Sequence, residues 1–170
     1  MAPNVDRAHP GLLGIIRAYA EQDRGFEARP DWAYQSSAHL LLAIGRQFTV
    51  APPPADMAGM PKRLCYSNSA RYATKHQAEG VVYAEGLALI RMGGAAFHLP
   101  HAWVVRRDGT VLDPTWDDRR GEDYVGVPIA DPALWPVDGG GLFSDFEQAL
   151  HLLRFGLPPN AIADVGRPLG

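Results

Sequence analysis

The chain has 170 residues, of which 46% are hydrophobic and 21% are charged, and its formal net charge is −3. A chain of this length buries roughly 70% of the surface that its unfolded form exposes. We therefore expect a single domain over 1–170 whose stability does not depend on disulfides or a bound metal. The charge balance excludes a strongly basic protein that binds nucleic acid through phosphates alone, and we find no direct nucleic-acid-binding signal. One cysteine excludes an intramolecular disulfide and a cysteine-rich zinc site.

No apolar run approaches the roughly 20 residues that a membrane-spanning helix requires, so we expect no membrane partner. The opening segment, MAPNVDRAHPGLLGII, lacks the charged region and long apolar core of a signal peptide. These observations predict a cytoplasmic protein, and they leave open an effector that is secreted by another route.

Two helices are predicted in residues 1–60. Apolar residues at helical spacing indicate a helix over 11–24, which Gly25 would end, and a second helix over 34–48. Residues 50–61 contain three consecutive prolines and are expected to form a loop, because proline fixes φ and lacks a backbone donor.

A short helix and the sheet are expected over 61–130. Ser67 and Asn68 are good N-cap residue types, and a helix from there would end near Gln77. Four runs rich in β-branched and apolar residues are predicted as strands: 79–92, 101–107, 110–114 and 123–129.

Two positions in these strands carry turn or packing signals. Asp108-Gly109 is a strong signal for a two-residue hairpin between the second and third strands. Gly86 lies inside the first strand, where it indicates a bulge or a close approach of another backbone.

The last predicted helix spans 143–156. Ser144 and Glu147 would form a capping box at its start, and Gly156 would end it. The final dozen residues are expected to be a surface tail. Helices at both ends, with consecutive strands between them, predict an α+β fold.

Cys65 is a candidate nucleophile. A lone cysteine is most often a small buried hydrophobic residue. This one lies just before a predicted helix start, where backbone N–H groups and the helix dipole favour a thiolate. The position therefore favours a reactive cysteine over the structural alternative.

His101 and Asp113 are candidates for the base and for the group that orients it. His101 would open a strand and emerge at a sheet edge, and Asp113 ends the next strand. The predicted hairpin places Asp113 opposite Val104, so a bulge or a slightly longer loop would bring it within reach of His101. An imidazole beside a carboxylate is the pair that nucleophilic catalysis requires.

The combination of Cys65, His101-Ala102-Trp103 and Asp113-Pro114-Thr115 resembles the transglutaminase-like cysteine enzymes, a branch of the papain-like superfamily. The resemblance covers about residues 60–117, and its specific part is the segment HAWVV…DGTVLDPTW. It implies a papain-like fold with the nucleophile helix packed on an antiparallel sheet, here with extra N-terminal helices.

The resemblance also implies roles and a reaction. Cys65 would be the nucleophile, His101 the base and Asp113 the orienting group, within a catalytic core over 61–130. The implied chemistry passes through a Cys65 thioester and either hydrolyses an amide or peptide bond or transfers the acyl group to an amine. The substrate would be a peptide, a protein or a small amide, and no cofactor is implied.

An oxyanion needs hydrogen-bond donors near the developing charge. The backbone N–H of Cys65 is the default donor, and the side-chain amides of Asn68 and Gln47 are candidates for the second. Each has a simpler alternative role: Asn68 as a helix-capping residue, and Gln47 as a solvent-facing residue at a helix end.

Glu85 stands out because it interrupts an apolar strand, with Tyr83 on the same face. An isolated buried carboxylate is costly, so Glu85 needs a partner or a cavity. We expect it at the wall of the Cys65 cleft as a substrate-facing group, with a structural pair to an arginine as the alternative. Tyr83 and Trp103 are further candidates for contact with the substrate, with a core or pocket wall as the alternative role of Trp103, and no metal site is predicted.

Two classes of function follow. The first is a cysteine-dependent hydrolase or acyltransferase, with hydrolysis favoured because the chain is too short to build a covered acceptor tunnel. The second is a catalytically silent papain-like module that binds a peptide or protein partner in the same groove. The presence of all three candidate residues in the order Cys, His, Asp favours the enzyme.

Overall fold

The computed structural model describes residues 11–24, 28–54, 57, 59–116 and 121–169. Within them the α-helices are α1 (Leu12–Asp23), α2 (Ser37–Ile44), α3 (Cys65–Lys75) and α4 (Phe146–Phe155). The strands are β1 (Arg46–Gln47), β2 (Val82–Met92), β3 (Ala95–Val105), β4 (Val111–Leu112), β5 (Asp123–Ile129) and β6 (Arg167–Pro168). Three short 3₁₀ turns are η1 (Gln77–Glu79), η2 (Pro132–Leu134) and η3 (Pro159–Ala161). The fold is α+β.

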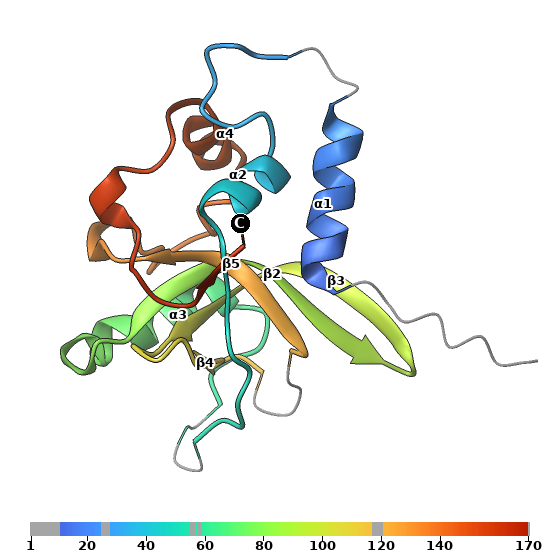
Figure 1. Cartoon of the computed structure of the whole chain (residues 1–170). Helices are drawn as coiled ribbons and strands as arrows, with labels where there is room; N and C mark the ends of the chain where they lie inside the picture. The colour runs from blue at the N-terminus through green and yellow to red at the C-terminus, as the bar shows by residue number, and fades with distance from the viewer. Residues whose placement is uncertain (1–10, 25–27, 55–56, 58, 117–120, 170) are drawn as a thin grey trace, which may run out of the picture.

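The strands form one antiparallel sheet in the order β4-β3-β2-β5-β1-β6. The long β2–β3 hairpin is its centre, and α1, α2 and α4 stand together on one side of it in Figure 1. Helix α3 packs against β2 and β3. Residues of α1, α2, α3, α4 and the sheet share one buried hydrophobic cluster.

The two faces of the β2–β3 hairpin carry different residues. Tyr83 lies opposite Val104 and belongs to the cluster that the helices cover, so we call this side the Tyr83 face. Ala84 lies opposite Trp103, and these two belong to a second, smaller buried cluster on the other side. We call that side the His101 face, because His101 and Trp103 are two residues apart on one strand.

The N-terminal predictions hold in outline. Helix α1 matches the range predicted over 11–24, while Gly25 lies outside the described residues. The helix predicted over 34–48 is wrong at both ends, because α2 covers only eight residues and stops before Gly45. A Cβ at Gly45 would lie 2.3 Å from a backbone oxygen of α2, so the chain turns there and Gln47 enters strand β1.

The start of α3 also differs from the prediction. The helix begins at Cys65, and its N-cap is Leu64, which makes no side-chain cap. Ser67 and Asn68 therefore lie inside the first turns and do not cap the helix. Cys65 is therefore the first residue of the helix, whereas the prediction started the helix near Ser67.

The strand predicted from His101 begins earlier, at Ala95. Gly93 and Gly94 both have positive φ and form a two-residue turn between β2 and β3. The sequence analysis did not use Gly93-Gly94 as a hairpin turn, because Pro100 argues against a continuous strand from Ala95. Proline is tolerated here since its missing N–H points to the outer side of β3, where β4 pairs only with Val104 and Val105.

The turn at Asp108-Gly109 is one residue longer than the two-residue hairpin, which is the longer-loop alternative of the sequence analysis. The Arg106 N–H donates to the Thr110 carbonyl, so three residues form the loop and Gly109 has φ +80°. This loop pairs Val104 with Leu112, which shifts the hairpin register by one residue from the prediction.

Gly86 marks a close approach of backbones, the second of the two alternatives. The β2–β3 pairing runs without interruption through this position. A Cβ on Gly86 would lie 2.3 Å from the Val125 carbonyl oxygen and 2.4 Å from Gly126 Cα on β5. Glycine is therefore required for β2 and β5 to pack at this level.

The C-terminal part corrects two predictions. Asp145 caps α4 by accepting from the Gln148 N–H, whereas the Ser144 hydroxyl accepts from the Gly141 N–H and closes the preceding turn. Gly156 ends the helix as predicted, with φ +75°. The last residues are not a simple tail, because β6 pairs with β1.

Along the described part of the chain, no helix combines the length and the apolar character needed to cross a membrane.

Candidate active site

Cys65 lies at the point where α3 meets the outer edge of β3. Ala70 and Ala73 are fully buried, and these small side chains let α3 approach the sheet closely. Cys65, the first residue of α3, lines one cleft together with Pro100 and His101 of β3. The Cys65 side chain is half-buried, and the helix N–H groups around it are not taken by a side-chain cap.

His101 is a mid-strand residue and only 2% exposed, which corrects the expectation that it opens a strand. Its Nε2 atom lies 2.7 Å from Asp113 Oδ2. Cys65 lines the same cleft as His101, and its side chain is one of the groups that raise the pKa of the His101 ring. The structure therefore brings Cys65, His101 and Asp113 together in one chain of contacts.

The shifted hairpin register explains why Asp113 reaches His101 without a bulge. Since Val104 pairs with Leu112, Asp113 stands level with Trp103, on the His101 face. His101 is then its diagonal neighbour, at a distance that side chains of this size bridge.

The other oxygen of Asp113 is held by the backbone that follows it. Oδ1 accepts from the Thr115 N–H at 3.0 Å and from the Trp116 N–H at 3.1 Å. These bonds fix the carboxylate plane, so Asp113 can hold the imidazole in one orientation.

Tyr124 on β5 belongs to the candidate site and is absent from the sequence analysis. Its hydroxyl donates to Asp113 Oδ2 at 2.9 Å and accepts from the Gly121 N–H at 3.1 Å. Burial, followed by the nearby Asp113, raises the pKa of Tyr124, so it remains a neutral donor. Strand alternation puts Tyr124 on one face of β5, but no local signal shows that β5 lies beside β2.

Two tryptophans flank the imidazole. Trp116 stacks on the His101 ring with a centroid distance of 3.6 Å and an interplanar angle of 8°. Trp103 is fully buried and packs edge-on against Tyr124 and Phe48. Trp103 therefore belongs to the core beneath the site, in agreement with the core role expected for it. Trp116 is the tryptophan that lines the cleft.

The surroundings of His101 favour its protonated form. Burial lowers the pKa of His101, but the hydrogen bonds to Asp113 and Cys65 outweigh it and raise the value to about 9. The flat contact with the Trp116 ring also stabilises a cation. The protonated imidazole is therefore the favoured form at neutral pH.

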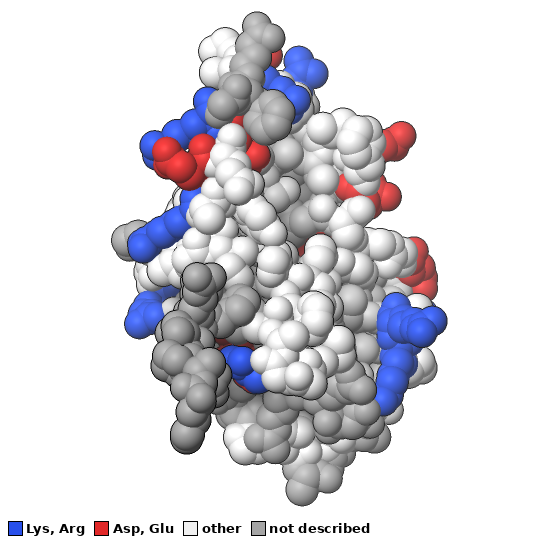
Figure 2. Space-filling model, turned by 90° about the vertical axis from the view of Figure 1, so that its right-hand side faces the viewer, with Lys and Arg blue, Asp and Glu red and all other residues white. Residues whose placement is uncertain are grey.

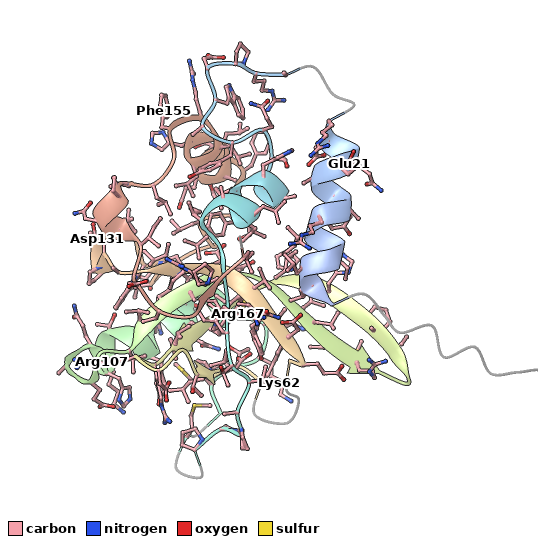
Figure 3. All side chains as sticks on the ribbon, in the orientation of Figure 1. Glu21, Lys62, Arg107, Asp131, Phe155 and Arg167 are labelled. Carbon is pink, nitrogen blue, oxygen red and sulfur yellow. The ribbon has the colours of Figure 1, made fainter. Side chains whose placement is uncertain are left out.

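Cys65 borders a cleft of about 370 Å³. Its walls come from the segment before α3, the edge of β3 and the residues after β4: Lys62, Arg63, Cys65, Leu99, Pro100, His101, Thr115 and Trp116. Lys62, labelled in Figure 3, lies on the side of the sheet away from α1 and α2 in that view. Arg63 has φ +69°, a strained conformation for a residue with a side chain, directly before the nucleophile helix.

The structure does not supply the predicted side-chain donors for the oxyanion. Asn68 is buried, and its amide nitrogen donates to the Pro61 carbonyl and to Thr115 Oγ1. Gln47 lies on β1, bonded to Asp123 and Arg167, outside the described lining of the cleft. Asn68 thus ties α3 to the segment after Asp113, and the Cys65 N–H remains the default donor.

Glu85 is buried on the Tyr83 face, not at the described wall of the Cys65 cleft. Its carboxylate accepts from the Tyr83 hydroxyl at 2.6 Å and from the Leu142 and Phe143 N–H groups at 2.8 Å each. Both the substrate-facing prediction and the arginine alternative are therefore replaced by a loop anchor. Burial raises the pKa of Glu85 to about 7, and burial also raises the pKa of Tyr83.

Comparisons with protein-family models, curated proteins and solved structures found no match to this chain. Among the residues that the structure describes, no group of three or more His, Cys, Asp or Glu side chains is arranged to hold a metal ion.

Proposed function

We propose that this protein is a cysteine-dependent hydrolase of amide or peptide bonds, with a papain-like, transglutaminase-like fold and Cys65 as the nucleophile. The observation that carries the proposal is the buried His101–Asp113 pair, whose remaining ring nitrogen serves the thiol at the start of α3. A histidine oriented by a carboxylate and bonded to a cysteine is the arrangement that activates a thiol for acyl transfer.

In the first step the Cys65 thiolate attacks the substrate carbonyl carbon. The new C–S bond forms as the carbonyl π electrons move to oxygen, and the N–H groups of the first turn of α3 stabilise that charge. When the tetrahedral intermediate collapses, the C–N bond breaks and the His101 cation gives its proton to the departing amine. A thioester on Cys65 remains, and His101 is neutral.

In the second step water replaces the amine. Neutral His101 takes a proton from water while the oxygen attacks the thioester carbon. The C–S bond then breaks, the electron pair returns to sulfur and the carboxylic acid leaves. The site ends as the same thiolate–imidazolium pair with which it began, and Asp113 holds the ring through both proton transfers.

The open cleft supports hydrolysis over transfer. Cys65 is half-exposed, and a cleft of about 370 Å³ reaches it from the surface. A transferase must keep water from its acyl intermediate, which requires a covered site. Water at its ordinary concentration is therefore the acceptor that this geometry favours.

Alkylation of Cys65 tests whether the thiol is activated. Iodoacetamide labelling at neutral pH, followed by mass spectrometry, should modify Cys65 faster than free glutathione is modified. The variant His101→Ala should lower the rate toward that of glutathione, while His151→Ala, a change at an exposed histidine on α4, should leave it unchanged. A wild-type rate equal to that of glutathione would favour the silent binding module instead.

Acyl transfer tests the reaction itself. With 4-nitrophenyl acetate as acyl donor, we expect an acetyl group on Cys65 that water removes, and no acetylation of Cys65→Ala. Glycinamide added at millimolar concentration competes with water as the acceptor of the acetyl group. Product formed mainly as the acetylated amine would make the protein an acyltransferase.

A further inference from the structure

A second hollow lies on the Tyr83 face, between the N-terminal helices and the hairpin. It has a volume of about 240 Å³ and an almost wholly apolar lining. We call it the α1–α2 pocket, and its walls include Ile16, Ala38, Leu41, Leu87, Pro100 and Phe143. An apolar cavity of about 150 Å³ is already large enough to bind benzene, so this one has room for a somewhat larger group.

The pocket meets the catalytic cleft at one residue. Pro100 lines both hollows, and it directly precedes His101 on β3. Pro100 is exposed on the outer edge of the strand, and the neighbours on either side of it in the chain face the cleft. A ligand that crosses this edge can therefore hold one group in the α1–α2 pocket and another at Cys65.

Glu85 anchors one wall of the pocket through hydrogen bonds. Phe143 forms part of that wall, and its backbone N–H is bound to the buried Glu85 carboxylate. The adjacent Leu142 N–H is bound to the same carboxylate, which is itself anchored by Tyr83. The carboxylate that interrupts an apolar strand thus holds a pocket wall through the backbone of another segment.

The mouth of the pocket is formed by residues that remain accessible. Tyr19 on α1 is 41% exposed, lines the pocket and contacts His98 Nε2 through its hydroxyl at 2.5 Å. Ser37, the first residue of α2, is also exposed and lines the pocket. Figure 2 shows the side of the molecule that carries α1, where the charged side chains lie toward the margins and the centre is largely uncharged.

We propose that the α1–α2 pocket binds an apolar group of the acyl substrate, of the size of a benzyl or short alkyl chain, while its carbonyl lies at Cys65. This inference rests on the proposed function, since it assigns the substrate class of the same site. Its physical basis is the removal of an apolar group from water into a preformed apolar hollow that adjoins the nucleophile.

Affinity labelling measures this preference without knowledge of the natural substrate. The probes are iodoacetamide and N-benzyl-iodoacetamide, and each rate with Cys65 is divided by the rate with free glutathione. We expect the corrected rate to be roughly tenfold or more higher for the benzyl probe, the scale of discrimination that an apolar pocket provides. Equal corrected rates would overturn the pocket proposal.

Two variants on α2 locate the effect. Ser37→Trp places bulk at the mouth of the pocket from an exposed position and should remove the benzyl preference. Ala43→Trp adds the same bulk to another exposed position on the helix, outside the described lining of the pocket, and should keep it. Both variants should retain the wild-type rate with iodoacetamide. A benzyl preference that survives Ser37→Trp would overturn the assignment.

Direct binding separates failure of the pocket from failure of the proposed function. N-benzylacetamide titrated into the variant Cys65→Ala should shift the NMR signals of Tyr19 and Phe143. Shifts there, combined with an unreactive wild-type Cys65, would support the pocket and overturn the hydrolase. A reactive Cys65 without shifts and without probe preference would overturn the pocket and leave the hydrolase standing.

Discussion

Two buried carboxylates lie on opposite faces of the sheet and have similar partners. Asp113 accepts from the Tyr124 hydroxyl and two backbone N–H groups, and Glu85 accepts from the Tyr83 hydroxyl and two backbone N–H groups. The difference is His101, which adds a cation to the Asp113 network. Among the described residues, the donors to Glu85 are neutral groups.

This difference sets what each network can do. On the His101 face the imidazolium balances the carboxylate, and the pair can pass a proton to a reacting group. On the Tyr83 face the described partners of the carboxylate are neutral, and burial raises its pKa to about 7. A tyrosine, two backbone amides and a buried acid therefore make a structural anchor, and the histidine converts the same arrangement into a candidate catalytic centre.

The largest expected effect comes from the same isosteric change in the two networks. Asp113→Asn should reduce the rate of acetylation of Cys65 by about 10³–10⁴-fold, because the amide holds the wrong tautomer of His101. Glu85→Gln should reduce it by less than about tenfold, since Glu85 acts only through the pocket wall. The measurement is the burst rate with 4-nitrophenyl acetate, and similar losses in both variants would contradict the distinction.

The two networks should also differ in the pH at which they affect stability. The folded-state pKa of Glu85 is raised from 4.5 to about 7, so the free energy of unfolding should fall as pH rises through that window. At about 1.4 kcal/mol per pH unit the fall is on the order of 3 kcal/mol. For His101 the pKa rises from 6.5 to about 9, so its stabilisation is complete below 6.5 and is lost as pH rises toward about 9.

Urea unfolding at a series of pH values separates these contributions. Glu85→Gln should remove the decline between pH 4.5 and about 7, and His101→Gln should remove the decline between pH 6.5 and about 9. A Glu85→Gln profile with the wild-type slope in the acidic window would show that Glu85 does not titrate there.

A smaller effect is expected from removing one tyrosine hydroxyl from each network. Tyr124→Phe leaves Asp113 with three other hydrogen bonds, so the loss of stability should be about 1 kcal/mol and acetylation of Cys65 should slow by up to about tenfold. Tyr83→Phe removes the matching hydroxyl from Glu85 and should change acetylation by less than about twofold. Equal slowing by both changes would mean that the hydroxyl of Tyr124 does not act through His101.

The smallest effect is expected at Gln47, which belongs to neither network. Its side chain bonds Asp123 and the exposed Arg167, so Gln47→Ala should cost no more than about 1 kcal/mol of stability and leave acetylation unchanged. A clear loss of acetylation in this variant would restore Gln47 as an oxyanion donor.

The local part of the fold could be read from the sequence because it depends on residues close along the chain. The α1 helix, the β5 strand, the turn near Gly109 and the stop at Gly156 were predicted from periodicity and turn chemistry. Errors occurred where one residue type carried two meanings. The sequence analysis placed a strand boundary at Pro100, although the open edge of β3 tolerates a proline there. It also assigned Ser144 as a helix cap, although the Ser144 hydroxyl closes the turn before the helix.

The candidate site divides in the same way. The spacing of His101 and Asp113 on one hairpin was sufficient to predict that they meet, and only the turn length had to be corrected. Asn68 and Gln47 could not be ranked as donors from sequence, because their partners, Thr115 and Asp123, are 47 and 76 residues away. Side-chain amides are placed by their hydrogen-bond partners, and those partners are brought close only by packing.

The sequence by itself determined the α+β pattern, the cysteine near a helix start and the hairpin that carries the histidine and the aspartate. Each of these follows from periodicity, capping or turn chemistry within a few residues. Only the tertiary structure decided that Tyr124 joins Asp113, that Glu85 anchors the loop at Phe143 and that Pro100 separates the cleft from an apolar pocket. Those contacts depend on which strands become neighbours and which face the helices cover, and the free energy that selects them comes from burial across the whole chain.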